Sequence, residues 1–290
     1  MQTMNSDAAN LNERRQDVAD ANIRADVPSP LAPHSSLLDY LLRLADSDLV
    51  LAQRLGEWVG KGPILEEDIA LTNVGLDLLG QARMWFAYAS EVEARDCGRG
   101  RSEDDLAFRR DGCDFRNLLL VEQPNGNYAD TMARQFYFDQ WNVLVLGALS
   151  ASRDARIAAI ASKAVKETVY HAERSSDWVV RLGDGTDESH RKMQDALDAL
   201  WMYTGEMFAV DRIEVELIEA GIAADARTLY DRWLANVRAV LDEATLALPT
   251  GTWMQGVNGR GGKQGVHTEH LGHMLAEMQF VQRAYPGLQW

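Results

Sequence analysis

The sequence has few of the features that mark secreted, membrane or nucleic-acid-binding proteins. Its two cysteines, Cys97 and Cys113, cannot build a disulfide framework, and their spacing matches no zinc motif. No apolar run reaches the roughly 18–20 residues that cross a bilayer. Lys and Arg number 29 against 44 Asp and Glu, so the formal charge is −15, which repels phosphate backbones and anionic membranes. We therefore expect a cytoplasmic protein that binds neither nucleic acid nor membrane.

Proline is also scarce, and no stretch alternates apolar and polar residues with the period of a β-strand. Only seven prolines occur in 290 residues, and segments rich in Ala, Leu, Arg and Glu predominate, which predicts an all-α protein. Residues 1–35 lack the apolar core of a signal peptide and are predicted to form a disordered tail. One helical domain is then expected over residues 36–290.

Four long helices are predicted first, over residues 37–58, 66–94, 128–150 and 154–182. The long connection between the second and third carries short predicted helices at 104–110 and 115–120. This layout is typical of a ferritin-like four-helix bundle. Additional C-terminal helices are expected over 187–208, 211–220, 224–246 and 269–284, and Ser36, Thr186 and Thr268 are the predicted helix caps.

The helix predicted at 66–94 is apolar around most of its circumference, which favours burial on all sides. Asn73, Asp77 and Gln81 share one stripe of it. Buried polar groups need partners, so we expect these three side chains to join a hydrogen-bond network between helices. Metal ligation and a surface covered by a partner protein are the alternatives for this stripe.

Residues 166–171 come close to a di-iron ligand motif. Four-helix carboxylate proteins bind their metals through Glu-x-x-His from two helices and one Glu from each of two others. A frame set by Glu167 has Tyr170 in the histidine position. A frame set by His171 has Thr168 in the glutamate position. The matching residues of the 66–94 helix are Asp77 and Gly80 for the first frame, and Leu78 and Gln81 for the second.

The ligand count falls short in both frames. Asp48 on the first helix and Asp139 on the third are candidate single carboxylates. Together with the His171 frame they give two acids, one histidine and one amide, whereas a di-iron centre needs about four carboxylates and two imidazoles. The sequence therefore predicts no di-iron site. A weak mononuclear site formed by Asp48, Asp139 and His171 is the alternative.

Two C-terminal stretches are further candidate sites. His267, His270 and His273 fall within seven residues but spell no metal motif, so structural roles are expected. The glycine-rich loop 258–265 carries Arg260 and Lys263, which could hold an anion beside exposed backbone amides. A flexible or partner-ordered surface loop is the favoured interpretation, and anion binding is the alternative. No nucleophile elbow or phosphate loop is present.

Several segments together resemble the C subunits of the bacterial phenylacetyl-CoA epoxidases, and the resemblance extends over about residues 37–290. Its most specific parts are Arg54–Trp58, Gly75–Arg83, Asn117–Asn127, Val179–Thr186 and His267–Gln279. The resemblance implies a ferritin-like fold and a place in a multicomponent di-iron monooxygenase. The complex epoxidises the aromatic ring of phenylacetyl-CoA in aerobic phenylacetate degradation.

The resemblance also implies a division of labour. The di-iron centre lies in a paralogous A subunit, a reductase passes electrons from NADPH, and the C subunit is a non-catalytic, structural partner that stabilises the A subunit. This chain is then expected to hold no cofactor itself; whether it forms a homo-oligomer when alone is left open. By this comparison Gln81 and His171 occupy the histidine positions and Asp48 and Asp139 the single-carboxylate positions. Leu78 and Thr168 replace the two glutamates.

Two other functions remain possible on the sequence alone. One is a metal-binding oxygenase subunit that is active in its own right. The other is a helical protein that binds a CoA thioester or a partner through Arg260 and Lys263.

Overall fold

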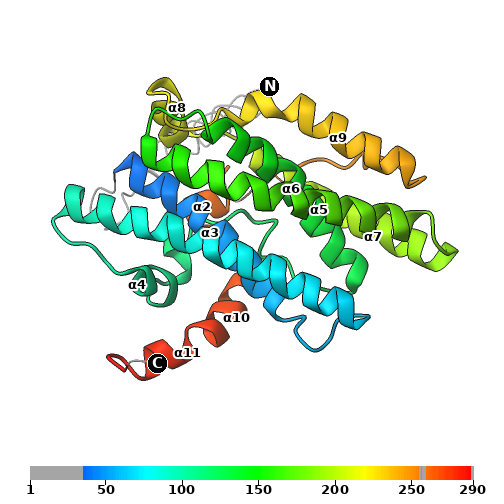
Figure 1. Ribbon diagram of the computed structural model, residues 1–290, viewed down its shortest axis with the longest axis horizontal. Helices are drawn as coiled ribbons and strands as arrows, with labels where there is room; N and C mark the ends of the chain where they lie inside the picture. Colours follow the sequence, from blue (N-terminus) through cyan, green and yellow to red (C-terminus); the bar gives the residue numbers. More distant parts are fainter. Residues whose placement is uncertain (1–34, 255, 257–258, 289–290) are drawn as a thin grey trace, which may run out of the picture. The chain divides into compact units, whose positions relative to one another are not determined.

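The four long helices predicted from the sequence form the centre of the protein (Figure 1). The computed structural model describes residues 35–254, 256 and 259–288, and these contain helices and no β-strand. The all-α class and the ferritin-like bundle are therefore confirmed. The predicted tail lies outside the described residues, apart from Ser35. No helix among the described residues is long and apolar enough to cross a membrane.

The bundle consists of two packed helix pairs joined by a long crossover. In the first pair α2 (Ser36–Gly56) packs on α3 (Leu65–Cys97), and in the second α5 (Tyr128–Leu149) packs on α6 (Ala155–Gly183). The crossover between α3 and α5 carries α4 (Glu103–Phe108) and the 3₁₀ turn η1 (Gly112–Asp114). A single long crossover of this kind gives the four helices their ferritin-like connectivity.

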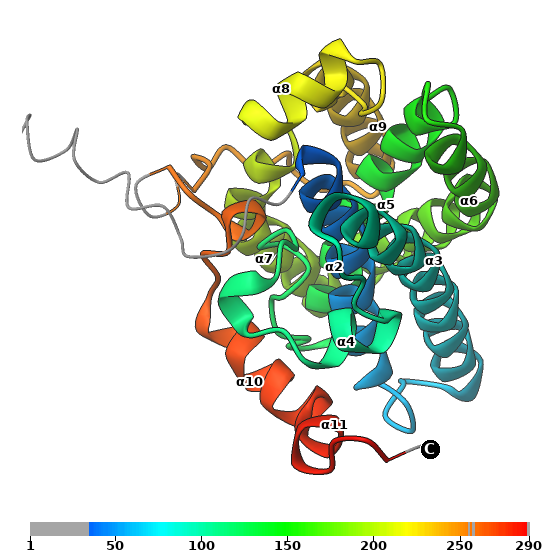
Figure 2. The same ribbon diagram turned by 90° about the vertical axis from the view of Figure 1, so that its left-hand side faces the viewer.

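Helix α2 lies inside the bundle and is buried on nearly every side, with α3 on one side and the crossover on another (Figure 2). Its charged residues therefore need partners in the protein interior. Asp46 accepts hydrogen bonds from the guanidinium of Arg110 and from the backbone N–H of Arg116, both in the crossover. Asp46 and Arg110 are 0% and 2% exposed, so this ion pair fixes the crossover against α2.

Three further helices pack against the bundle: α7 (Asp187–Thr204), α8 (Arg212–Glu219) and α9 (Tyr230–Glu243). An aromatic cluster ties α7 and α9 to α5. The ring centroids of Tyr137 on α5 and Trp201 on α7 lie 5.9 Å apart, and those of Trp201 and Trp233 on α9 lie 5.8 Å apart. The Trp233 indole donates a hydrogen bond to the Tyr137 carbonyl at 3.2 Å. Satisfied indoles of this kind allow large aromatic rings to be buried.

The predicted helix over residues 115–120 is wrong, because tertiary contacts hold this apolar run in an irregular conformation. Its backbone N–H groups bond outside the segment instead of along a helix. The N–H of Leu118 donates to the Ser47 hydroxyl at 3.2 Å, and that of Leu119 donates to the Glu206 carboxylate at 2.7 Å. Polar side chains on distant elements have thus replaced the helical bonding that the local sequence favours.

The helix ends differ from the predictions in several places. Ser35, not Ser36, caps α2 and accepts from the Leu38 N–H at 3.2 Å. Thr186 caps α7 as predicted. Thr268 precedes α10 (Glu269–Met278), but its hydroxyl donates to Glu122 instead of capping the helix. The last predicted helix is divided at Gln279, where α11 (Phe280–Ala284) follows α10.

The predicted burial of the whole of α3 is also wrong. Only Gln81 of the polar stripe is buried, whereas Asn73 is exposed and the Asp77 side chain is 40% exposed. Several large apolar residues of α3 are exposed as well, among them Leu65 at 71% and Leu76 at 59%. Helix α3 therefore has one face in the bundle and one apolar face directed outward.

Candidate functional site

The six positions singled out from the sequence come together at the centre of the four-helix bundle. They lie on all four helices and are 4% exposed or less: Asp48 on α2, Leu78 and Gln81 on α3, Asp139 on α5, and Thr168 and His171 on α6. By contrast, Tyr170 and Gly80 of the competing frame are exposed. The His171 frame is therefore the one that faces the bundle interior.

The two frames are linked to each other by hydrogen bonds between α3 and α6. The Gln81 amide donates to the Glu167 carboxylate at 2.9 Å. One helical turn away, His171 Nε2 lies 3.1 Å from the Asp77 carboxylate. Each inward residue thus bonds to a residue of the outer frame on the opposite helix. Gln81 and His171, the side chains that could have faced a metal, therefore join α3 to α6 by hydrogen bonds.

The two positions where the family comparison expects glutamate contribute no ligand. Leu78 is fully buried among apolar side chains. The Thr168 hydroxyl donates to the Ala164 carbonyl of its own helix at 3.1 Å. Both side chains fill the interior by packing and local bonding, so the negative charge that two metal ions require is absent here.

The two buried acids differ in their surroundings. Burial raises the pKa of Asp48 well above its usual range, and the Trp85 side chain is the neighbour that lowers it. Burial also raises the pKa of Asp139, to about 6, against the lowering effects of the nearby His171 and of hydrogen bonds from Ser175 and Gln135. The Gln135 amide donates to Asp139 Oδ1 at 2.6 Å. In both places burial disfavours the ionised carboxylate relative to an exposed acid.

A di-iron centre does not fit this set of side chains. Gln81 Oε1, Asp139 Oδ2 and His171 Nδ1 are buried without a hydrogen-bond partner, and the Asp48 carboxylate is buried in the same bundle. Among the described residues no group of three or more His, Cys, Asp or Glu side chains is placed to hold a metal ion. Two carboxylates, one imidazole and one amide fall short of the roughly four carboxylates and two imidazoles of a di-iron centre, and amides are poor iron ligands.

Among the three C-terminal histidines, His267 makes contacts that stabilise the fold. His267 lies 2.8 Å from the Glu122 carboxylate and 3.0 Å from the Phe115 carbonyl. Burial opposes protonation of His267, but Glu122 outweighs it, so the pKa of His267 is raised. Glu122 is fully buried and also accepts from the backbone and hydroxyl of Thr268. His273 is exposed on α10.

Glu122 is a central residue that sequence reasoning missed. It joins the crossover to the start of α10, and its own carbonyl accepts from the Arg54 guanidinium at 2.7 Å. Its only sequence signal is a position in the Asn117–Asn127 segment, where a lone acid follows a run of apolar residues.

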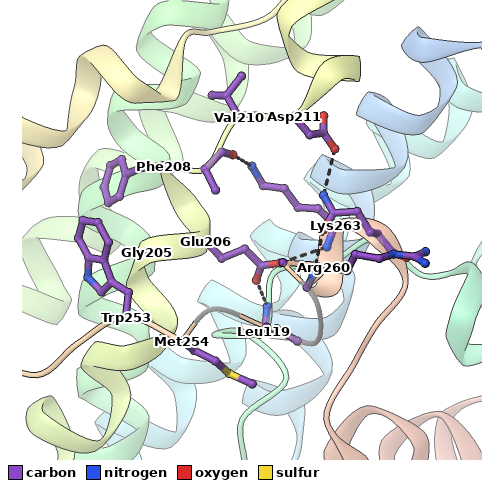
Figure 3. Close-up of a pocket in the computed structure, with 15 residues that line it drawn as sticks. Leu119, Gly205, Glu206, Phe208, Val210, Asp211, Trp253, Met254, Arg260 and Lys263 are labelled. Atoms are coloured by element: carbon purple, nitrogen blue, oxygen red, sulfur yellow. Dashed lines mark hydrogen bonds between the residues drawn. The ribbon is translucent and has the colours of Figure 1, made fainter. Parts of the chain in front are cut away.

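The glycine-rich loop lines an open pocket of about 400 Å³ (Figure 3). Phe208 and Trp253 form one wall, and the Arg260 side chain is directed away from them. Lys263 is only 5% exposed, and its ammonium donates to Glu214 at 2.9 Å and to the Ala209 carbonyl at 2.8 Å. Lys263 therefore stabilises the fold and is not presented to an external anion. Arg260 is exposed and donates to the Gln264 carbonyl at 3.2 Å.

Comparison with known proteins agrees with the motifs that suggested an epoxidase component. Residues 4–290 match the model of the family described as phenylacetic acid catabolic protein. A curated relative, the C subunit of the 1,2-phenylacetyl-CoA epoxidase of Escherichia coli (strain K12), is 54% identical over 256 residues. The alignment covers 88% of this chain and 100% of that relative. The chain therefore belongs to the phenylacetic acid catabolic protein family.

Proposed function

We propose that this chain is the non-catalytic C subunit of a phenylacetyl-CoA epoxidase, and that it binds and stabilises the catalytic A subunit. The di-iron centre and the NADPH-derived electrons then belong to partner proteins of the complex. Identity of 54% to a protein named as a C subunit, over the whole length of that protein, supports the assignment to this complex. A subunit that only supports the other proteins of a complex needs no reaction centre of its own.

The observation that carries the non-catalytic role is the way in which the bundle centre is filled. Gln81 and His171 are engaged with Glu167 and Asp77 between α3 and α6. The acid that faces His171, Asp139, has a pKa raised to about 6 by burial. Such a centre is held together by packing and hydrogen bonds, and it lacks the charge that would attract a pair of divalent ions.

The proposal is tested by reconstituting the complex with and without this chain. We expect the A subunit to require the chain for full turnover of phenylacetyl-CoA and for its own stability. We also expect the purified chain, incubated with Fe(II) without oxygen, to retain far fewer than the two irons of a di-iron site. About two irons per chain, or full activity of the A subunit alone, would contradict the proposal.

A substitution at the bundle centre separates a scaffold from a catalyst. His171→Gln removes the imidazole but leaves an amide that can bond to Asp77. We expect the reconstituted complex to keep turnover within about 2-fold of wild type, because the chain supplies no catalytic group; loss of a catalytic group typically costs about 100-fold or more. His273→Gln, on the exposed face of α10, is the matched control. Loss of turnover of that size with the complex still assembled would overturn the non-catalytic role.

A further inference from the structure

Both ring nitrogens of His267 lie at hydrogen-bond distance from oxygen atoms. Nδ1 is 2.8 Å from Oε2 of Glu122, and Nε2 is 3.0 Å from the carbonyl oxygen of Phe115. A carbonyl oxygen can only accept, and a neutral imidazole has a single N–H to donate. A neutral His267 would therefore satisfy one contact and direct a lone pair at the other oxygen. The two contacts together require the imidazolium form, which donates from both nitrogens.

The other hydrogen bonds of Glu122 place its carboxylate in the accepting role. Oε1 accepts from the backbone N–H of Thr268 at 2.6 Å and from its hydroxyl at 2.7 Å. Oε2 accepts from the Asn117 amide at 2.9 Å, in addition to the contact with His267. Two donors at each oxygen use about the full accepting capacity of a carboxylate. The proton between Glu122 and His267 therefore belongs to the imidazole.

The pair is shielded from water, which makes loss of this proton costly. The side chains of His267 and Glu122 are 7% and 0% exposed. Without the proton on Nε2, this nitrogen and the Phe115 carbonyl would be two buried acceptors facing each other, and Glu122 would lose its cationic partner. Burial lowers the pKa of His267, but the hydrogen bonds to Glu122 and Phe115 and the charge of Glu122 outweigh this and raise it.

Charged and titratable groups of three other elements lie near the pair. They are Asp46 and Arg54 on α2, Tyr203 on α7 and Glu206 in the 3₁₀ turn η2 (Gly205–Met207). Asp46 favours the imidazolium and is itself paired with Arg110. Burial, with a contribution from the charge of Glu122, raises the pKa of both Tyr203 and Glu206. The charges of Glu122 and Asp46 thus agree with the hydrogen-bond geometry in favouring a protonated His267.

The pair stands at the start of the C-terminal arm, which we define as residues 266–284 with α10 and α11 (Figure 1). The loop before the arm packs closely on the crossover. A side chain at Gly262 or Gly265 would collide with backbone carbonyls of the crossover, and Gly265 also has a φ of +74°. The loop is therefore fixed up to Gly265, and the contact between His267 and Glu122 attaches the arm that follows.

The arm is packed lightly against the rest of the protein. Its helix α10 buries Leu271, Met274 and Leu275, while a groove of about 510 Å³ opens between the arm and η1. Further polar attachments are made by Arg54 to the His270 carbonyl, by Gln279 to the carbonyls of Ala107 and Arg110, and by Arg283 to Asp111. An element with few buried apolar side chains opens locally at lower cost than the core does. Loss of one anchor can therefore decide whether the arm stays attached.

We propose that His267 is a pH-sensitive latch that holds the C-terminal arm on the crossover when its imidazole is protonated and releases the arm when it is neutral. This inference does not depend on the function proposed above. A histidine that gains a partner on folding contributes its full stabilisation below the pKa of an unfolded histidine, about 6.5. The stabilisation is lost as pH rises through the pKa of the folded state. The latch is therefore closed at acidic pH and opens towards alkaline pH.

The test follows the imidazole and the arm together in the purified full-length chain, between about pH 5.5 and about pH 9.5. The assigned NMR signal of the His267 ring gives the midpoint of its protonation. Amide hydrogen exchange, corrected for the intrinsic effect of pH on exchange, gives the protection of α10. We expect the midpoint to lie above about 6.5 and the protection of α10 to fall by at least about 10-fold through the same midpoint, since a hydrogen bond of a charged group is lost. The protection of α5, in the bundle core, should not change.

Two variants separate the latch from other effects of pH. His267→Gln has no charge, and its amide nitrogen can serve only one of the two oxygens well. We expect α10 in this variant to have, at every pH, the low protection that wild type reaches at alkaline pH. His273→Gln, on the exposed surface of the same helix, is the matched control and should follow wild type.

Several outcomes would overturn the latch. One is a His267 midpoint at or below about 6.5, or a ring signal that does not titrate within the range. Another is a ring that titrates while the protection of α10 stays constant, which would make the pair a fixed structural contact. A fall in α10 protection with pH that persists in His267→Gln would assign the control to a different group. If His267→Gln does not fold, the wild-type titration alone decides, because it compares the ring and the arm in one protein.

Discussion

Asp139→Asn tests whether the bundle centre carries the cost of a buried acid. The pKa of this carboxyl is raised by burial from 3.8 to about 6, so the folded protein binds its proton more tightly than the unfolded chain does. For an acid whose pKa is raised on folding, the free energy of unfolding falls as pH rises from about 4 to about 6. It does not recover at higher pH. A pKa difference of about 2 corresponds to about 3 kcal/mol, since each tenfold change in proton affinity is worth about 1.36 kcal/mol.

The asparagine variant removes this titration but keeps an oxygen for the Gln135 amide, which donates to Asp139 at 2.6 Å. Its new amide N–H₂ replaces Oδ2, an atom without a partner, so a constant penalty of about 1–3 kcal/mol accompanies the change. The pH dependence is therefore the diagnostic. About half of the roughly 3 kcal/mol develops above pH 5, so we expect the stability of the variant relative to wild type to rise by about 1.5 kcal/mol between pH 5 and pH 8.

Urea unfolding followed by circular dichroism at several pH values measures this difference, because titrations common to both proteins cancel. Asp195→Asn, on the exposed surface of α7, is the control and should show no such trend. A relative stability that stays constant with pH, or that falls as pH rises, would refute the assignment of Asp139 as a buried acid with a raised pKa.

Two further variants, one single and one triple, test the packing and the absence of a metal site. Arg110→Met leaves the Asp46 carboxylate buried without its guanidinium partner, and we expect a loss of about 3–5 kcal/mol in urea unfolding. The triple variant Leu78→Glu, Gln81→His and Thr168→Glu restores both Glu-x-x-His pairs. We expect it to bind close to two Fe(II) or Mn(II) ions per chain by metal analysis, about the number of a di-iron site, and to gain thermal stability when metal is added.

The controls for these variants lie next to the altered residues. Arg109→Met changes a neighbouring arginine whose side chain is 51% exposed, and it should cost less than about 1 kcal/mol. If both arginine variants lose the same free energy of unfolding, the buried pair of Asp46 and Arg110 has no special role in stability. Adding His171→Gln to the triple variant should abolish metal binding; metal retained without this imidazole would place the ions elsewhere.

The long helices could be predicted because their signals are local. Apolar periodicity and capping residues such as Asp154 and Thr186 define most of their ends. The run Leu118–Leu120 fails for the opposite reason. Its composition favours a helix, but the Ser47 hydroxyl and the Glu206 carboxylate, which are distant in the sequence, bind its backbone N–H groups.

Burial and the choice between the two ligand frames are harder to predict from the sequence. An apolar helix surface has the same pattern whether it meets its own core or a partner, so the pattern predicts burial for Leu76 and Leu79 although both are exposed. Spacing alone also leaves two frames open at Glu167 and His171. The structure shows that residues of both frames bond to one another across α3 and α6.

The hydrogen bonds between α3 and α6 take the structural place that metal ions have in a di-iron bundle. In a metal-binding bundle the ions themselves hold the facing helices together. Here α3 and α6 are joined by Gln81 with Glu167 and by Asp77 with His171. The Asp77 side chain is still 40% exposed, so this bond lies at the edge of the buried centre.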